Sequence, residues 1–419
     1  MVDRWRVLAA LLATRWRRFG SREALQRYQE RRLRTILTRA RRTFPAYAQV
    51  QGTALTDFPI LDKEGWLSRF DGLNDRGLSL EQCLAAAGAA ETSGSFDATL
   101  AGVSVGLSSG TSGRRGVFLT SPQEQARWAG AMLAKTLPSL REPVRVALVL
   151  RSGGPLYEAV GGGRITFTHI DLALPAETIN ERLLAFAPTV LAAPPQVLDD
   201  LARHPIRPGP TVIYSVADVL DDDVAARIER GFGLTVGQVY QATEGFLGIT
   251  CAHGTLHLNE DLVHVERELI DAETGRFVPV LTDLYRSTQA IIRYRLGDVL
   301  VPGPDECPCG SVFATIARIE GRAEDVPHFT SRSGGDRPLF TDVIRAALLA
   351  APGVQDFRLV QRGDGSLRLA VRPPQAQASA HLALHRLLES RALVVPEIGG
   401  MPWPVEAATD KRRRVRRVV

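Results

Sequence analysis

Cysteine is scarce in this sequence, with four residues in 419. Small secreted proteins that are held together by disulfides use many more, so the sequence argues against that class. Long apolar runs are also missing. The longest early run, Val7 to Ala13, falls far short of the ~20 residues that span a bilayer, and no convincing small-residue cleavage site follows it. We therefore expect a cytoplasmic protein without a membrane span.

The charges are nearly balanced, with 51 Lys and Arg against 46 Asp and Glu. Much of the positive excess lies at the two ends, in the arginine-rich stretch from Arg4 to Arg42 and in the basic run from Lys411 to Arg417. A basic tail can bind nucleic acid. A solvated helix face or a segment directed at ATP explains the same residues, so a nucleic-acid partner is the less favoured hypothesis.

The length predicts more than one domain, because 419 residues exceed what one hydrophobic core usually supports. Residues 21–47 predict a helix that ends before Pro45. From Pro143 onward, β-branched runs alternate with amphipathic windows, which predicts parallel strands covered on both faces. Strands are expected at Val144–Leu150, Thr189–Ala193, Thr211–Ser215 and Leu234–Tyr240, and helices at Ala176–Ala187, Gln196–Arg203 and Asp221–Phe232.

The pattern changes again after residue 255. Antiparallel strands are expected at His264–Ile270, Phe277–Leu284 and Ile291–Arg295. After Gly321, a helix at Thr341–Ala350, strands at Phe357–Gln361 and Leu367–Arg372, and a helix at Ala378–Arg391 predict a small α+β unit. We therefore expect an α/β protein. Residues 1–321 would form a large domain with mostly parallel sheets and a small antiparallel subdomain, and residues 322–419 an α+β C-terminal domain.

A loop rich in glycine and serine follows the strand-like residues 102–107. It reads Ser108-Ser109-Gly110-Thr111-Ser112-Gly113-Arg114-Arg115-Gly116. Glycines let backbone N–H groups turn toward an anion, hydroxyls add donors, and the arginines add positive charge for phosphate. No lysine precedes Ser or Thr at the spacing of the common phosphate-binding loop. Composition alone leaves two readings open, an anion-binding loop and a flexible surface linker.

Four segments resemble, in the same order, the motifs of the adenylate-forming superfamily of acyl and aryl ligases. They are Ser108–Gly116, Tyr240-Gln241-Ala242-Thr243-Glu244, Tyr294-Arg295-Leu296-Gly297-Asp298 and Gly321-Arg322-Ala323-Glu324-Asp325. The phenylacetate–CoA ligase branch is the most similar, as judged from the segments Phe44-Pro45-Ala46-Tyr47 and Cys307-Pro308-Cys309-Gly310. The resemblance implies a large adenylation core, a mobile C-terminal lid and the use of ATP.

The resemblance also implies roles for individual residues. The residues expected to bind ATP are Ser108, Ser109, Gly110, Thr111, Ser112, Gly113, Arg114, Tyr240, Asp298 and Arg322. Thr243 would contact phosphate and Glu244 would hold Mg²⁺, which prefers oxygen ligands. Glu324 occupies the hinge position, where relatives carry Asp. Without the other motifs, Thr243 and Glu244 would be read as a helix-start cap and Asp298 as part of a simple turn.

A lysine near the C-terminus completes the resemblance. Relatives use such a lysine to neutralise the reacting carboxylate and phosphate. Lys411 is the sole lysine after Lys135, so it is the candidate catalytic lysine. Asp410 stands where relatives have a glycine, and a frayed basic tail is the alternative.

The pocket for the acid is expected near residues 152–162, 216–218 and 241–245. Tyr157 is the one aromatic residue of the first stretch, and Ala217 and Gly245 represent the other two. In the family the matching region binds an aryl or arylacetic acid. Plain core packing of Tyr157 is the equal alternative.

Three of the four cysteines and one histidine suggest a metal site. Thiolates and imidazole suit tetrahedral Zn²⁺, so Cys251, His257, Cys307 and Cys309 are the candidate ligands of a structural zinc. Some relatives in the resembled branch carry a similar set. His253 competes with His257, which lies in an alternating pattern where a core histidine is the alternative.

The residues and the resemblance together predict ATP-dependent activation of an organic carboxylic acid to acyl-AMP. The resemblance predicts that this acid is aromatic. A thioester with CoA or with an acyl carrier protein would follow. Two other functions stay open: a catalytically silent protein that binds nucleotide and zinc, and an adenylating enzyme that passes the acyl group to a non-thiol acceptor.

Overall fold

The computed structural model describes residues 3–93, 98–107, 115–137, 139, 141–151, 161–405 and 413–418. Two compact units emerge. One comprises residues 1–296 and 301–318, and the other comprises residues 297–300 and 319–419. Strands β14 (Asp298–Pro302) and β15 (Thr315–Arg322) carry the chain between them.

The division into domains 1–321 and 322–419 stays a prediction. The expected α/β fold class is confirmed by the mixed sheet, the small antiparallel sheet and the α+β region described below.

The N-terminal segment of the first unit is helical. Helix α1 (Arg4–Arg15) begins at Asp3, whose carboxylate accepts from the N–H of Trp5, and α2 (Arg22–Thr43) begins at Ser21, whose hydroxyl accepts from Ala24. Helix α2 stops before Pro45, as expected, because a proline disfavours helical backbone at the residue before it. Shorter helices follow at η1 (Pro45–Tyr47), η2 (Leu55–Asp57), α3 (Lys63–Leu67), η3 (Phe70–Gly72) and α4 (Leu80–Thr92). Among the described helices, none is long and apolar enough to cross a membrane.

Helix α2 is fastened to a distant part of the same unit. The Arg22 guanidinium donates to the Glu260 carboxylate, with Nη2 2.6 Å from Oε1. The Gln29 amide donates to the Glu260 carbonyl at 2.8 Å, and Arg32 Nη2 donates to the Leu284 carbonyl at 2.8 Å. The basic residues near the start of the chain are therefore partly explained by contacts within the protein.

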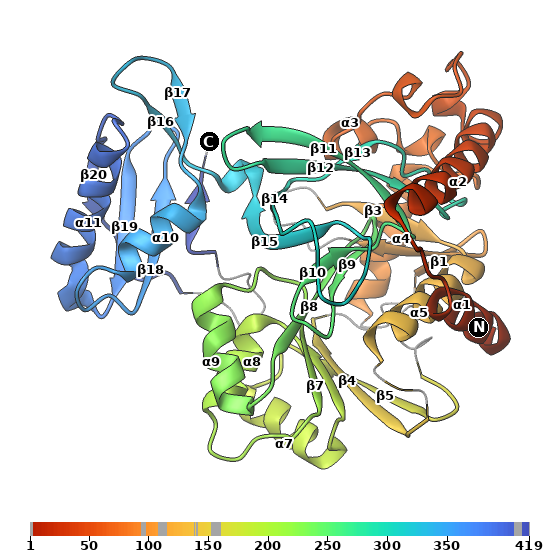
Figure 1. The fold of residues 1–419 in the computed structure, drawn as a ribbon, viewed down its shortest axis with the longest axis horizontal. Helices are drawn as coiled ribbons and strands as arrows, with labels where there is room; N and C mark the ends of the chain where they lie inside the picture. Colours follow the sequence, from red (N-terminus) through yellow and green to blue (C-terminus); the bar gives the residue numbers. More distant parts are fainter. Residues whose placement is uncertain are drawn as a thin grey trace. The chain divides into compact units, whose positions relative to one another are not determined.

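Five parallel strands form one half of the large sheet. In spatial order they are β8 (Val236–Ala242), β7 (Val212–Ser215), β6 (Val190–Ala193), β4 (Val144–Leu150) and β5 (Ile165–Asp171). The connecting helices are α7 (Ala176–Phe186), α8 (Pro195–Arg203) and α9 (Asp222–Phe232). Figure 1 shows this alternation of strand and helix in green and yellow. The expected strands and helices of this region lie within two residues of the observed ones.

Both faces of this half-sheet are buried, as the β-branched runs predicted. Alternate residues such as Val149 and Leu191 pack against α7, α8 and α9. Residues between them, such as Val190 and Tyr214, pack against α5 (Pro122–Thr136) and α1 on the other face. The two helices cross closely at Gly130, where a β-carbon would lie 2.6 Å from the Val7 carbonyl oxygen. A side chain at this position would separate α1 from α5.

Antiparallel strands extend the large sheet beyond β8. They include β9 (Gly245–Thr250), β10 (Leu256–Leu258), β11 (Val263–Asp271), β12 (Arg276–Asp283) and the short β13 (Tyr294–Arg295). The strand expected at Ile291–Arg295 is reduced to its last two residues, because Arg293 has a φ of 46° that interrupts extended backbone. A separate three-stranded antiparallel sheet contains β1 (Ala98–Leu100), β2 (Val103–Leu107) and β3 (Val117–Thr120).

The second unit has its own sheet and core. Its four-stranded sheet has the order β20 (Ile398–Gly400), β19 (Leu367–Arg372), β18 (Asp356–Gln361), β21 (Val415–Arg417). The remaining elements are η4 (Ala323–Asp325), β16 (His328–Thr330), β17 (Asp336–Pro338), α10 (Thr341–Leu349), η5 (Pro374–Ala376) and α11 (Gln377–Ser390). Phe357 and Leu369 pack with Leu384 of α11 in an apolar core. The expected helices and strands of this unit are found at their predicted positions.

Adjacent leucines of α7 test how the core stabilises the first unit. Leu183 is fully buried, whereas Leu184 is exposed. We expect Leu183→Ala to lower the free energy of unfolding by about 2–5 kcal/mol, because it leaves a cavity in a packed core. Leu184→Ala should change it by about 0.5 kcal/mol or less. Urea unfolding of both variants checks this, and equal losses would contradict the assigned burial.

Candidate active site and cysteine cluster

Thr243 and Glu244 form the turn between β8 and β9. These strands are antiparallel, and Ala242 pairs with Gly245, so the two residues make up the whole connection. Strand β8 is also parallel to β7. The turn therefore lies at the carboxyl edge of the parallel strands, where open α/β sheets bind their ligands. Both side chains are half-buried, and Tyr240 is buried two residues before the end of β8.

Arg286 supports this turn from the side. Its Nη2 donates to the Thr243 carbonyl at 3.0 Å. Arg286 is itself positioned by Asp283, whose Oδ1 accepts from the backbone N–H groups of Tyr285 and Arg286, each at 2.7 Å. Burial raises the pKa of Asp283, and the Arg286 guanidinium opposes that rise. A β-carbon at Gly245 would lie 3.6 Å from Asp283 Oδ2, so the predicted pocket residue Gly245 lies beside this carboxyl group.

Glu124 fixes the other end of the same loop. Its Oε1 accepts from the backbone N–H groups of Ser287 at 2.6 Å and Thr288 at 2.9 Å. Its Oε2 accepts from Ser121 at 2.8 Å, which completes the capping box of α5. Burial disfavours the charged form of Glu124, but these backbone donors outweigh burial, and its pKa lies below the ordinary value. A buried, ionised carboxylate thus ties the loop to α5.

The end of β7 supplies a further part of this edge. Ser215 is its last residue, and its hydroxyl is buried without a hydrogen-bond partner in the described part of the chain. Ala217 follows with a φ of 67°, an unusual conformation for a residue with a side chain. Such local strain is commonest where a backbone is held for function. The expected pocket residue Ala217 therefore lies at a distorted turn.

Asp298 and Arg322 meet within the second unit. Arg322 Nε lies 3.2 Å from Asp298 Oδ1. The N–H of Ala323 donates to the Gly297 carbonyl at 2.7 Å, and a β-carbon at Gly297 would lie 2.8 Å from Arg322 Nη1. Gly297 therefore allows the close approach of the two motif segments.

The hinge candidate Glu324 lies one residue from a buried ion pair. Glu324 is exposed on η4, whereas its neighbour Asp325 is buried and forms an ion pair with Arg413. Arg414 pairs with Asp356 at 2.8 Å, which fastens the chain to β18 just before β21. Three groups of predicted site residues, Ser108–Arg114, Tyr157 and Lys411, lie outside the described residues.

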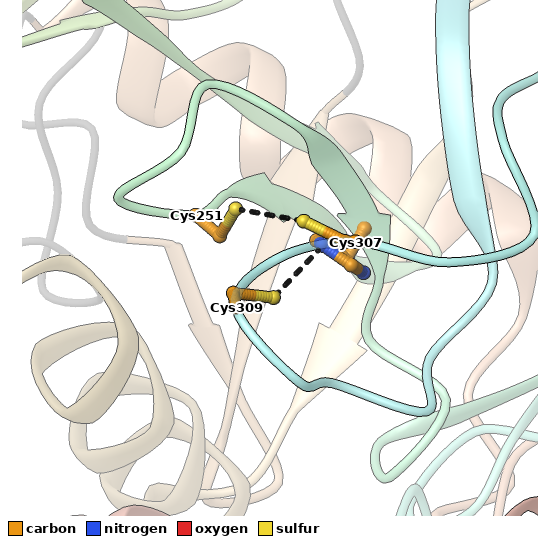
Figure 2. A group of neighbouring side chains, drawn as sticks. Cys251, Cys307 and Cys309 are labelled. Carbon is orange, nitrogen blue, oxygen red and sulfur yellow. Dashed lines mark hydrogen bonds between the residues drawn. The ribbon is translucent and has the colours of Figure 1, made fainter.

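The three cysteines and His257 come together in the first unit. One ligand atom from each lies within 4.8 Å of the others. Cys251 Sγ is 3.7 Å from Cys307 Sγ, and Cys309 Sγ is 3.4 Å from His257 Nε2. Figure 2 shows the sulfur atoms of the three cysteines facing one another from two separate loops. His253 is exposed, so the imidazole that joins the thiols is that of His257.

The two cysteine loops share one geometry. In each, the fourth residue donates its N–H to the carbonyl of the first cysteine, Gly254 to Cys251 and Gly310 to Cys307, both at 3.0 Å. Both glycines have positive φ values, 80° and 72°. In the first loop the N–H of His253 also donates to Cys251 Sγ, at 3.4 Å. The Thr255 hydroxyl and the Cys309 backbone N–H lower the pKa of Cys307 to about 6.

His257 has the tautomer that a metal ligand needs. Its Nδ1 lies 3.1 Å from the Phe313 carbonyl oxygen, which can only accept, so Nδ1 carries the proton and Nε2 presents a lone pair to the cluster. Metal-bound histidines are usually held in this way by a second hydrogen bond. The Phe313 ring lies 5.9 Å from that of Phe19 and 5.0 Å from Lys135 Nζ. The donor set therefore fits a tetrahedral Zn²⁺, with three thiolates and one neutral imidazole.

The supporting residues Asp283, Arg286 and Glu124 were not predicted from the sequence. Arg286 and Thr243 are 43 residues apart, and Glu124 and Ser287 are 163 residues apart. None of the three belongs to a motif that would mark it as part of a site. The local signals are a strand that ends in Asp283 and the capping-box spacing of Ser121 and Glu124, and neither is specific to a functional site.

No family model matches the sequence, and no curated protein matches it. Solved structures do match. A 2-hydroxyisobutyryl-CoA ligase in the postadenylation state has a TM-score of 0.67 and 19% identity, over 95% of this chain and 89% of that chain. An anthranilate–CoA ligase with anthranoyl-AMP has a TM-score of 0.52 and 15% identity, over 74% and 63% of the two chains. An amide bond synthetase from Marinactinospora thermotolerans has a TM-score of 0.50 and 14% identity, over 74% and 67%. The chain therefore shares the fold of these ligases, as the resemblance of the four motifs implied.

Glu124 provides a test of the supporting network. We expect Glu124→Gln to lower the free energy of unfolding at pH 7 by about 1–3 kcal/mol, because the backbone donors lose an ionised acceptor. The folded-state pKa lies below the unfolded value, so this contribution is full above about pH 4.3 and is lost as the pH falls through the folded-state pKa. Urea unfolding at pH 7 and in acid should show that the difference in the free energy of unfolding between wild type and Glu124→Gln becomes smaller as the pH falls. The exposed control Glu142→Gln should leave stability within about 0.5 kcal/mol of wild type at pH 7. If this difference in the free energy of unfolding grew in acid, the role of Glu124 as an ionised acceptor would be contradicted.

Proposed function

We propose that this protein uses ATP to activate an organic carboxylic acid as acyl-AMP. The observation that carries the proposal is the Thr243–Glu244 turn at the carboxyl edge of the parallel strands. It stands in a chain whose fold matches a 2-hydroxyisobutyryl-CoA ligase over 95% of its length. The motif and the fold thus point to the same chemistry independently.

The reaction would join two anions, so the site must neutralise charge and align the reactants. A carboxylate oxygen forms a bond to the α-phosphorus, and the bond from that phosphorus to the bridging oxygen breaks, which releases pyrophosphate. Residues Ser108–Arg114 would surround the phosphates and Thr243 would contact one of them. Glu244 offers one carboxylate, which suits Mg²⁺ because this ion usually keeps several waters and phosphate oxygens as its other ligands.

The second unit would supply the ribose contact and the catalytic lysine. Asp298 would accept from the ribose hydroxyls, with Arg322 beside it at 3.2 Å. Lys411 would neutralise the reacting carboxylate and phosphate. Arg413, two residues further on, pairs with Asp325 next to the hinge residue Glu324, so the chain that carries Lys411 is fastened beside the hinge.

We propose an aromatic acid as substrate and CoA or an acyl carrier protein as acceptor. The similar solved structures include a ligase bound to anthranoyl-AMP, which supports an aromatic acid, and one bound to 2-HIB-AMP, which supports a small aliphatic acid. Tyr157, Ala217 and Gly245 are the proposed pocket residues. The amide bond synthetase among the similar structures supports a second candidate, transfer of the acyl group to an amine.

The cysteine cluster is proposed to hold a structural Zn²⁺. A site in which all four ligands come from the protein leaves no open position for a substrate. It would clamp the loop after Cys251 to the loop that contains Cys307 and Cys309. The metal would supply stability and would take no part in the reaction.

Pyrophosphate exchange tests the proposed reaction. We expect acid-dependent incorporation of labelled pyrophosphate into ATP when a panel of aromatic and aliphatic acids is screened with Mg²⁺ present. Glu244→Gln and Lys411→Ala should each reduce the exchange by about a hundredfold or more, because each removes a charge that the transition state needs.

Matched variants serve as controls for that screen. Glu273→Gln removes an exposed carboxylate, and Arg416→Ala removes an exposed charge from the same C-terminal segment as Lys411. Both should retain full exchange. ATP binding without exchange for any acid would instead favour a silent nucleotide-binding protein, and full exchange by Lys411→Ala would end its proposed role.

Metal analysis tests the zinc site. We expect about one zinc per chain in the wild type and a strong loss in Cys307→Ser and His257→Ala, since three ligands hold the ion less tightly than four. A chelator should lower the Tm of the wild type and leave that of Cys307→Ser unchanged. The control Cys83→Ser changes a buried cysteine of α4 and should keep the metal. Metal-free wild-type protein purified without chelator would contradict the proposal.

A further inference from the structure

Helix α1 has a second apolar face that its packing leaves exposed. Val7 and Leu11 are buried against α5, as the core of this part of the protein requires. Trp5 and Trp16, at the two ends of the helix, are 79% and 73% exposed, and Leu8 between them is 42% exposed. Elsewhere in the described part of the chain, strongly exposed large apolar side chains occur singly on their elements.

The exposed apolar residues form one straight stripe. Positions 5, 8, 12 and 16 are separated by three, four and four residues, so they share one side of an α-helix. Leu12, which is half-buried, continues the stripe between Leu8 and Trp16. At 1.5 Å per residue the stripe is roughly 16 Å long. In Figure 1 α1 lies alongside α5, which contacts its buried face.

Arginines flank the stripe on both sides. Arg4 and Arg6 are exposed near its first end, and Arg18 is exposed just beyond Trp16. Arg4 also lies close to the turn at Gly162, where a β-carbon would be 3.7 Å from its Nε. Two residues further on, Arg164 is exposed and donates to the carbonyl of Arg141, which is exposed as well.

The acidic groups nearby do not cancel this charge. Asp3 caps α1 and lies 3.5 Å from Arg6 Nε, and Glu142 is adjacent to Arg141. Among the described residues of these segments, five arginines are exposed, Arg4, Arg6, Arg18, Arg141 and Arg164, against the two carboxylates of Asp3 and Glu142. The stripe and its surroundings form a surface that is apolar along its middle and cationic along its edges.

We propose that this surface of α1 binds an anionic lipid membrane. Tryptophan is the residue that settles at the boundary between headgroups and acyl chains, and a helix with an apolar face between cationic edges lies in that plane. The long arginine stems can lie along the apolar region while the guanidinium groups reach the phosphates. The helix stays packed on α5, so the protein rests on the bilayer through the exposed side of α1 and does not cross it. Negative surface potential attracts the flanking arginines.

Vesicle binding by the full-length protein tests the proposal. We expect cosedimentation with phosphatidylcholine vesicles that contain about one-third phosphatidylglycerol, much weaker binding to phosphatidylcholine alone, and a loss of binding as salt is raised. The double variant Trp5→Ala/Trp16→Ala should bind anionic vesicles at least about tenfold more weakly. Because both side chains are exposed, this variant should keep the wild-type fold. Arg4→Gln/Arg6→Gln should weaken binding to the anionic vesicles and leave the weak binding to neutral vesicles unchanged.

A matched control and a spectroscopic readout complete the design. Leu269→Ser changes a side chain of β11 that is 61% exposed, and it should bind vesicles like the wild type. The tryptophan fluorescence of the wild type should shift to shorter wavelength on anionic vesicles, and that of Trp5→Ala/Trp16→Ala should not.

Any one of the following results would overturn the proposal: no wild-type binding to anionic vesicles, equal binding by the tryptophan variant, or a concentration-dependent dimer that the variant abolishes in the absence of vesicle binding. Binding to an acidic protein that requires both tryptophans, together with no binding to vesicles, would also overturn it. These assays use neither ATP nor an acid, so their outcome is independent of pyrophosphate exchange.

Discussion

The reversal of strand direction at β8 is the constraint on which the candidate site depends. Strand β8 follows β7 through helix α9 and runs parallel to it, then returns as β9 through two residues. Parallel neighbours require a long crossover, whereas antiparallel neighbours allow a tight turn. The reversal therefore keeps Thr243 and Glu244 at the carboxyl edge of the sheet, where the ends of β7 and β8 meet. A longer connection would leave the Glu244 carboxylate free to move away from that edge.

The turn gains its rigidity from charged groups that are buried beside it. Asp283 and Glu124 hold the two ends of the loop that contains Arg286, and Arg286 reaches the Thr243 carbonyl. Each carboxyl group accepts hydrogen bonds from backbone N–H groups, and at Glu124 these donors outweigh the cost of removing the charge from water. The proposed site, which would organise phosphate and a metal ion, would benefit from such support, because small displacements of catalytic groups have large effects on rate.

Local patterns in the sequence predicted much of the fold. The β-branched runs at Val144–Leu150 and Thr211–Ser215 are visible in any short window, and so is the glycine that each cysteine loop requires. The break at Arg293 is not visible, since the contacts that accompany its positive φ, with Glu266 and the Phe58 carbonyl, are made with residues distant in the sequence. The distant partners of Arg286 and Glu124, the Thr243 carbonyl and the N–H groups of Ser287 and Thr288, are equally invisible, because the tertiary fold alone brings them together. The meeting of Cys251 and Cys307, 56 residues apart, was predicted from ligand chemistry and not from periodicity.

The contacts of α2 also set the order in which the protein can assemble during synthesis. Arg22 leaves the ribosome before its partner Glu260, which is made 238 residues later. At the usual speed of translation this is a delay of roughly ten to fifty seconds. Glu260 in turn accepts from the N–H of Ala314, next to the Phe313 carbonyl that holds His257, so the receiving surface is complete only once the cysteine loops exist. Helix α2 therefore docks in its final place only after the strands and loops that bind it have been made.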